Sequence, residues 1–231
     1  YESFENIKLP DQFTFKVNKN LIKSNTSKQK FISLVKKAKN YIKKGDIFQV
    51  VLSQRFERKI NKKPIEIYNY LRKSNPSPFM FYFNYNDFKV LGSSPEILVR
   101  LRNGEITIRP IAGTRPRGRT KKEDKKYVLD LLKDKKELAE HLMLLDLGRN
   151  DVGKVSKVNT VKVTEKFKVE KYSHVMHIVS NVVGKFNYKS SIFETLLSGF
   201  PAGTVSGAPK IRAMEIIDEL EKNKRKLYAG G

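Results

Sequence analysis

The sequence contains no cysteine, and its 231 residues include only three histidines. The fold therefore cannot contain a disulfide, and a zinc site would have to use histidine and carboxylate side chains alone. No apolar run approaches the length that crosses a bilayer, and no signal-peptide pattern opens the chain. We expect a soluble, cytoplasmic protein without a membrane partner.

Acidic residues are also scarce, because 24 Asp and Glu stand against 47 Lys and Arg, giving a formal net charge of +23. Such an excess is typical of nucleic-acid-binding proteins, and a basic protein of that class is one alternative for this chain. The lysines, however, are spread through every segment, and half of the arginines lie between Arg100 and Arg119. Arginine is the better fork for anions, so that span is more informative than the total charge. We expect no nucleic-acid partner.

The length allows one large domain or two small ones with a buried core. The chain starts at Tyr1 rather than Met and ends on the turn-like Tyr228-Ala-Gly-Gly231. We expect it to be a piece of a longer protein.

Residues 198–210 are rich in Gly, Pro, Ser and Thr and cannot hold regular structure. Helical spacing follows at Ile211, Met214, Ile217 and Leu220, with Pro209 where a first-turn proline is tolerated. A glycine loop that enters a helix N-terminus presents free backbone N–H groups and suits an anion. The segment does not match a nucleotide-binding P-loop. A plain loop packed under a helix is the alternative.

Secondary-structure signals come in blocks rather than in regular alternation, which favours an α+β fold with mainly antiparallel sheets. Asn103-Gly104 is a strong hairpin signal because both turn positions need a positive φ. Expected helices cover residues 28–45, 64–72, 125–132, a helix from Asp134 with Leu138, Leu142 and Leu145 buried, and a short helix capped by Ser191 and Glu194. Expected strands cover residues 47–56, 79–85, 88–91, 97–101, 105–109, 160–169 and 174–183, and residues 111–118 are expected to form a loop.

Two carboxylates lie three residues apart on the helix that starts at Asp134. Glu137 and Glu140 project from neighbouring positions on one helical face, whereas His141 points elsewhere. Converging carboxylates suit Mg²⁺, which prefers oxygen ligands and shares itself between carboxylates, waters and an anionic ligand. A solvated helix face is the alternative interpretation.

Four long motifs resemble those of the chorismate-utilising enzymes, most closely the large-subunit (component I) branch of the anthranilate synthases. The motifs span residues 110–118 (PIAGTRPRG), 137–151 (ELAEHLMLLDLGRND), 171–180 (KYSHVMHIVS) and 201–210 (PAGTVSGAPK). The resemblance implies a sandwich of two large, mainly antiparallel sheets with helices outside, incomplete in this chain. Residues 1–27 would be a linker or the remnant of an N-terminal regulatory segment, and residues 28–231 a partial chorismate-binding catalytic domain.

The same resemblance implies roles for individual residues. Glu137 and Glu140 would hold Mg²⁺ against the ring carboxylate of chorismate. Glu96 would be the general acid for the departing C4 hydroxyl, with a raised pKa, and His177 would lie near that hydroxyl. The substrate-binding residues would be Gly113, Thr114, Thr204 and Tyr228, with backbone N–H groups of Gly207 and Ala208. Pro78, Phe79 and Met80 would form half of a site for L-tryptophan as feedback inhibitor.

Two positions distinguish branches within this resemblance. Relatives that add water have a lysine base where this sequence has Gln49, and ammonia needs no such base. Aminodeoxychorismate synthases often have a nucleophilic lysine where this sequence has Ala112. The resemblance thus implies a Mg²⁺-dependent carbon–oxygen lyase that makes anthranilate in tryptophan biosynthesis, with aminodeoxychorismate synthase component I of the folate pathway as the alternative.

The resemblance also implies a hetero-oligomer in which a glutamine amidotransferase (component II) supplies ammonia. A C-terminal stretch that carries a second carboxylate pair and a substrate arginine in the family is absent from this sequence. We therefore expect these 231 residues alone to be inactive.

Overall fold

The computed structural model describes residues 22–172 and 174–229. The chain forms two compact units, of which the first contains Tyr1–Ser27 with Gln54–Glu96 and the second Lys28–Ser53 with Ile97–Gly231. Most of the predicted linker, residues 1–21, lies outside the described residues. The predicted linker and catalytic domain therefore stay predictions.

The first unit is built from two antiparallel strand pairs and a helix. Strand β1 (Ile22–Ser24) pairs with β3 (Phe56–Arg58), and β4 (Phe79–Asn84) pairs with β5 (Lys89–Ser94). The helix α2 (Pro64–Ser74) begins with proline, whose missing N–H costs nothing there. The predicted strand over residues 47–56 is wrong in its length, because regular pairing is confined to β2 (Gln49–Val50) at one end and β3 at the other.

A five-stranded antiparallel sheet forms the centre of the second unit. Its longest strand, β10 (Val175–Lys185), pairs along one edge with β9 (Lys162–Lys171) and along the other with β7 (Glu105–Ile108) and β8 (Ile111–Pro116). Strand β6 (Arg100–Arg102) joins β7 through the predicted turn, where Asn103 and Gly104 have φ of 51° and 72°. The prediction of a loop over residues 111–118 is wrong. Residues 111–116 form β8, because β10 supplies a strand partner that the Gly and Pro content of the segment did not indicate.

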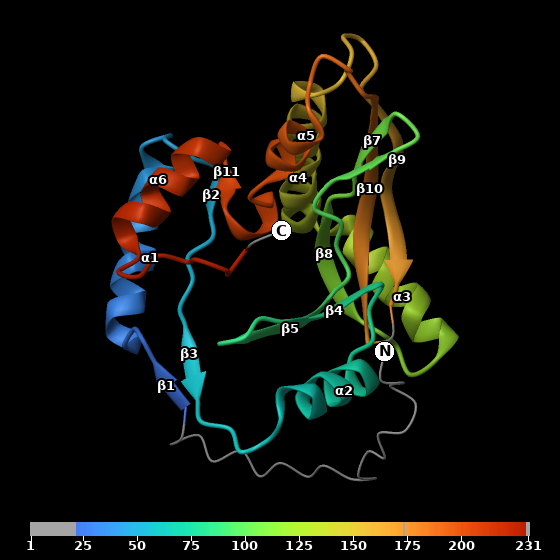
Figure 1. The fold of residues 1–231 in the computed structure, drawn as a ribbon. Helices are drawn as coiled ribbons and strands as arrows, with labels where there is room; N and C mark the ends of the chain where they lie inside the picture. The colour runs from blue at the N-terminus through green and yellow to red at the C-terminus, as the bar shows by residue number, and fades with distance from the viewer. Residues whose placement is uncertain (1–21, 173, 230–231) are drawn as a thin grey trace. The chain divides into compact units, whose positions relative to one another are not determined.

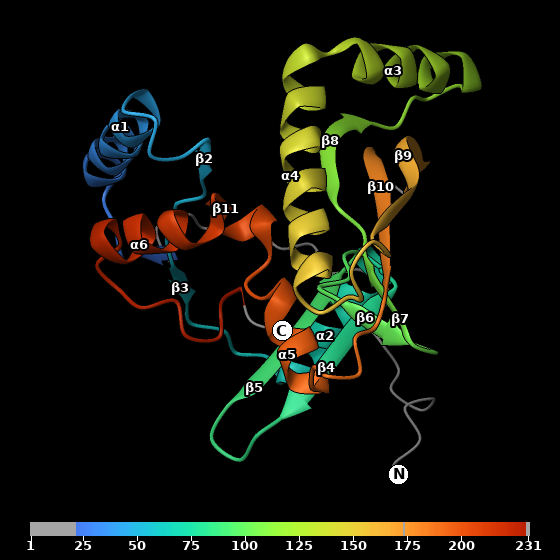
Figure 2. The same cartoon turned by 90° about the horizontal axis from the view of Figure 1, so that it is seen from above.

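The helix α4 (Lys135–Lys154) lies along this sheet, with α3 (Lys121–Lys133) before it (Figure 2). Asp134 caps α4 by accepting from the N–H groups of Lys136 and Glu137. The predicted buried face is wrong at Leu142, which is 45% exposed. The buried side chains of α4 instead follow the sheet: His141, Leu144, Leu145, Gly148, Asp151 and Val152.

A second layer of this unit carries the glycine loop (Figure 1). It contains α1 (Lys28–Lys43), β2, the two-residue strand β11 (Gly207–Ala208), and α6 (Lys210–Leu220), with Leu34, Ile47 and Ile216 in its core. The helix α5 (Ile192–Gly199) has the predicted capping box of Ser191 and Glu194. One prediction fails here, because Ile211 is 71% exposed, and the buried residues of α6 are Lys210, Ala213, Ile216, Ile217 and Leu220.

The α+β class with antiparallel pairing is confirmed, since every strand pair in the described residues is antiparallel. None of the helices in residues 22–172 and 174–229 is long and apolar enough to cross a membrane.

Candidate active site

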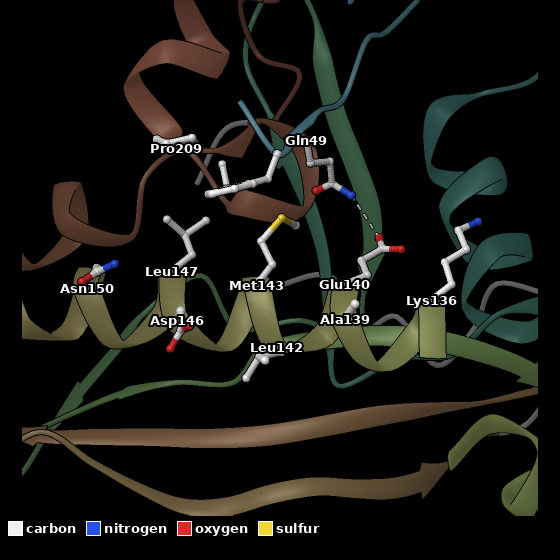
Figure 3. A pocket seen from close by; sticks show the side chains of 12 residues that line it. Gln49, Lys136, Ala139, Glu140, Leu142, Met143, Asp146, Leu147, Asn150 and Pro209 are labelled. Atoms are coloured by element: carbon white, nitrogen blue, oxygen red, sulfur yellow. Dashed lines mark hydrogen bonds between the residues drawn. The ribbon is translucent and has the colours of Figure 1, made fainter. Parts of the chain in front are cut away.

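Helix α4 presents the two predicted metal-binding carboxylates at its N-terminal end. Glu140 Oε1 accepts a hydrogen bond of 3.2 Å from Gln49 Nε2, which comes from β2 (Figure 3). Glu137 lies beside β8, and its Oε1 atom is 4.0 Å from Nη1 of Arg115 in that strand. A Cβ at Gly113 would lie 3.3 Å from Glu137 Oε2, and Gly113 has φ of +80°. Glycine is therefore favoured by the backbone conformation, and an added Cβ would also be tight against Ile178 Cδ1, at 3.0 Å, and the Glu137 carboxylate.

Strands β8 and β10 bring Gly113, Thr114 and His177 together. His177 and Thr114 are register partners, and a register shift follows between His177 and Ile178. His177 Nδ1 is 3.0 Å from Thr114 Oγ1 and 3.3 Å from the carbonyl oxygen of Gly113. Because the carbonyl can only accept, this geometry favours a proton on Nδ1. Nε2 is then the nitrogen that can accept a proton.

The other wall of the site is formed where the glycine loop pairs with β2. Gly207 pairs with Val50 and Ala208 with Gln49. Gly207 has φ of +139°, and a Cβ at this position would collide with the carbonyl group of Gln49. The loop thus approaches β2 as closely as only a glycine backbone allows. It holds the predicted N–H donors of Gly207 and Ala208 next to Gln49.

A pocket of about 680 Å³ lies between α4 and this loop wall. Figure 3 shows Glu140, Met143 and Leu147 projecting from α4 toward Gln49 and Pro209. The lining is mostly apolar with a few polar groups, as expected of a small-molecule site. The lining residues are Phe48, Gln49, Lys136, Ala139, Glu140, Leu142, Met143, Asp146, Leu147, Asn150, Ala208 and Pro209.

Helix α4 offers two carboxylates, of Glu137 and Glu140, as oxygen donors suited to Mg²⁺. No group of three or more His, Asp or Glu side chains that could hold a metal ion occurs in the described part of the chain. Mg²⁺ in proteins is usually held by one or two carboxylates, with waters and an anionic substrate completing the octahedron. Glu137 and Glu140 fit that pattern, and their metal-binding role stays a prediction.

Two predicted site residues lie elsewhere in the second unit. Thr204 is in the short 3-10 helix Gly203–Val205, next to α4. Tyr228 follows α6, lines a separate pocket of about 240 Å³, and has its ring centroid 5.5 Å from the Arg225 guanidinium. Their substrate contacts stay predictions.

Ala112 lies in β8, and the remaining predicted residues belong to the first unit, which is described by itself. Glu96 is its last residue, and the Glu96 N–H donates to Ser94 Oγ at 3.3 Å. Phe79 and Met80 open β4 as register partners of Ser94 and Ser93. Their roles, and that of Pro78, stay predictions.

Several residues that the sequence did not single out hold the site together. Lys210 is buried and donates to Asp151 Oδ2 at 2.7 Å, which ties the end of the glycine loop to α4. Burial lowers the pKa of Lys210. His141, which was expected only to point away from the two carboxylates, is buried, with Nε2 2.7 Å from Ser180 Oγ, and burial lowers its pKa to about 4. The local sequence gave no signal that Lys210 is buried, because α6 contains four other charged residues, Arg212, Glu215, Asp218 and Glu219.

Comparison with known proteins identifies the family. The model of the chorismate binding enzyme family matches residues 3–231, nearly the whole chain. The chain belongs to the chorismate-binding enzyme family. Among curated members, anthranilate synthase component 1 of Cereibacter sphaeroides is 62% identical over 91% of this chain and 42% of its own length. The Aquifex aeolicus protein of the same name is 57% identical over 90% and 42%.

Solved structures of family members confirm the fold. Anthranilate synthase component I from Streptococcus pneumoniae TIGR4 superposes with a TM-score of 0.81 at 44% identity, over 88% of this chain and 45% of that one. A 2,3-dihydroxybenzoate-specific isochorismate synthase from Bacillus anthracis gives a TM-score of 0.71 at 26% identity, over 88% and 56%. The predicted fold of the chorismate-utilising enzymes is therefore confirmed. The chain spans less than half the length of the curated relatives that it matches.

Proposed function

We propose that this chain is part of the large subunit of an anthranilate synthase, which converts chorismate and ammonia to anthranilate and pyruvate. The observation that carries the proposal is the 62% identity to a protein named anthranilate synthase component 1. The position of Gln49 supports it, because its neutral amide, bonded to Glu140, lines the pocket where a water-adding enzyme needs a base.

In the proposed reaction, ammonia adds at C2 of chorismate, the C4 hydroxyl leaves, and pyruvate is then eliminated. Mg²⁺ held by Glu137 and Glu140 would neutralise the ring carboxylate of the substrate. Gly113, Thr114 and Thr204, the N–H groups of Gly207 and Ala208, and Tyr228 would bind and orient chorismate. His177, whose Nε2 can accept a proton, would act near the C4 position, and Glu96 would donate the proton that the hydroxyl needs to leave.

The same proposal includes partners. A glutamine amidotransferase subunit would deliver the ammonia, which makes the full-length enzyme a hetero-oligomer. L-Tryptophan would inhibit through a site that includes Pro78, Phe79 and Met80. Ser93 Oγ lies 2.7 Å from Asn75 O and from Ser77 Oγ, so the segment before β4 is fixed against β5. Such fixed geometry suits a binding site.

The second candidate is aminodeoxychorismate synthase, which adds ammonia at a different ring position. The absence of a lysine at Ala112 disfavours it, because the side chain there is a methyl group in β8.

The deciding experiment supplies the full-length protein with chorismate, ammonia and Mg²⁺ and identifies the product by chromatography. We expect anthranilate with pyruvate in equal amounts. Aminodeoxychorismate as the main product would overturn the proposal in favour of the second candidate. With ammonia omitted, chorismate should remain, and rapid formation of isochorismate would contradict the role given to Gln49.

A further inference from the structure

One partly buried arginine contacts three segments that carry predicted site residues. Arg225 follows α6, and its side chain is 16% exposed. Its Nη1 donates to the carbonyl oxygen of Val205 at 2.5 Å, and its Nη2 donates to that of Val51 at 2.6 Å. The Val205 carbonyl is at the end of the 3-10 helix Gly203–Val205, and the Val51 carbonyl comes directly after β2, so neither belongs to a strand ladder. The guanidinium therefore takes the place of a strand partner.

A carboxylate in the same place fixes the orientation of the guanidinium. Glu221 is four residues earlier, with a side chain 7% exposed, and receives Arg225 Nη2 at 2.6 Å and Nε at 3.0 Å. It also accepts from the N–H of Ser53 at 2.7 Å and from its hydroxyl at 3.1 Å. With both oxygens used twice, the carboxylate can hold only one arrangement of its neighbours.

The contacts of this ion pair lie close in sequence to predicted site residues. Val51 is two residues after Gln49, and Val205 is next to Thr204. Tyr228 is on the same turn as Arg225, with its N–H bonded to the Arg225 carbonyl at 3.0 Å and its ring 5.5 Å from the guanidinium. The three segments are also joined by the two-residue pairing of β2 with β11, by single hydrogen bonds, and by the packing of Val50 and Leu52 against the apolar cluster that contains Ile216 and Leu220.

We propose that Arg225, held by Glu221, is a positioning residue that sets the relative places of Gln49, Thr204 and Tyr228. This inference rests on the proposed function for the identity of the ligand. Arginine is required because only a planar fork reaches two carbonyls and a carboxylate at once, whereas lysine is a single point charge. A buried ion pair adds little net stability by itself. Its effect is to select one geometry of the loop wall.

The test compares Arg225→Lys and Glu221→Gln with Arg212→Lys in the full-length protein. Arg212 is a matched control, since it forms ion pairs with Glu215 and Asp46 but its side chain is 40% exposed. Arg225→Lys keeps the charge next to Glu221 and loses the carbonyl contacts. We expect the chorismate KM to rise roughly tenfold with a smaller fall in kcat, because a slightly misplaced binding group weakens the bound geometry. Glu221→Gln should give a smaller rise, and Arg212→Lys none.

A second readout does not depend on the reaction. The N–H of Val51 donates to the carbonyl of Ser206 at 2.9 Å, within the wall that the ion pair holds. Hydrogen exchange at this amide should become faster in Arg225→Lys and Glu221→Gln and stay unchanged in Arg212→Lys, at temperatures where all are folded.

The outcomes separate the two proposals. If the wild-type protein fails to convert chorismate, the proposed function fails, and the exchange data alone decide the positioning role. Unchanged exchange at Val51 overturns the positioning role whatever the activity. A KM equal to that of the control, or a loss of activity that follows only the unfolded fraction, also overturns it.

Discussion

The two sides of the candidate site are held in place by different kinds of contact. The sheet side, made of α4, β8 and β10, rests on a strand ladder and on fully buried apolar residues such as Ile106, Val152 and Val182. The loop side, made of β2, residues 200–209 and the turn after α6, has two-residue strands, a small apolar cluster that includes Ile47 and Ile216, and two largely buried ion pairs. Burial of a large apolar side chain contributes about 1.5–3 kcal/mol, whereas a buried ion pair gives little net stability.

This difference suggests a division of labour. On the sheet side many residues contribute to strand pairing and apolar packing. A single polar substitution there should therefore alter the chemistry and leave the fold intact. On the loop side geometry depends on a few charged or glycine residues, so a single change there should move the backbone. The predictions below test this division, from the largest effect to the smallest.

Replacement of His177 by alanine should have the largest effect on the chemical step. His177 lies at the register shift of β10, within hydrogen-bond distance of Thr114. Positioned proton transfer typically contributes about 10²–10⁴ in rate. We expect kcat of the full-length His177→Ala enzyme to fall by about that factor, with chorismate KM little changed and the melting temperature close to wild type. A many-fold rise in KM at normal kcat would make His177 a binding group.

Glu140→Gln should lower kcat/KM by roughly a hundredfold, because it removes one of the two anionic ligands that α4 offers to Mg²⁺. The Gln49 contact at 3.2 Å can persist with an amide partner, so the fold should remain. Activity is measured as a function of Mg²⁺ concentration. The control is Glu215→Gln, an exposed partner of Arg212. Wild-type turnover at unchanged Mg²⁺ dependence would refute the metal role of Glu140.

Gly207→Ala tests the fragility of the loop side. The added Cβ would collide with the Gln49 carbonyl at a φ of +139°, a conformation that L-residues avoid. We expect a loss of about 2 kcal/mol or more in unfolding free energy from chemical denaturation, and faster hydrogen exchange at Val51.

Gly45→Ala is the matched control for this change. Gly45 also has a positive φ, of +82°, but a Cβ there meets nothing within 4 Å. It should cost only about 1 kcal/mol and leave exchange at Val51 unaltered. Equal costs for the two variants would show that the close approach of the loop to β2 is unimportant.

Acid should weaken the contact between β8 and α3 through Asp124. The Arg117 hydrogen bond, with help from the Gly118 N–H and Lys171, holds the pKa of Asp124 well below its ordinary value of 3.8. The folded state therefore binds fewer protons, so this stabilisation is complete above pH 3.8 and is lost as pH falls through the folded pKa.

Denaturation curves of wild type and Asp124→Asn check this prediction. The variant should be less stable at pH 7, and the gap should shrink as the pH is lowered below 3.8. Asp218→Asn, which changes an exposed carboxylate paired with Lys224, should show no gap at either pH. A gap for Asp124→Asn that is independent of pH would show that packing, not charge, is what the carboxylate contributes.

Several features of this protein are determined by the sequence alone, because they depend only on residues that are close together in the chain. The start of the helix at Pro64 follows from the fixed geometry of the proline ring. The starts of the helices after Asp134 and Ser191 follow from their side-chain caps. The Asn103-Gly104 turn follows from the positive φ that those residues tolerate. Long motifs identified the family, and the i, i+3 spacing of Glu137 and Glu140 put both carboxylates on one face.

Tertiary structure decided what depends on distant partners. Residues 111–116 form a strand only because β10 offers a ladder, and the buried face of α4 is set by the sheet, which leaves Leu142 exposed. Gln49 meets Glu140 across 91 positions, and Arg225 meets Val51 across 174. Neither contact has a periodic signature, since it is the packing of whole elements that brings such side chains together. The charges that hold the loop side were visible in the sequence, but their partners were not.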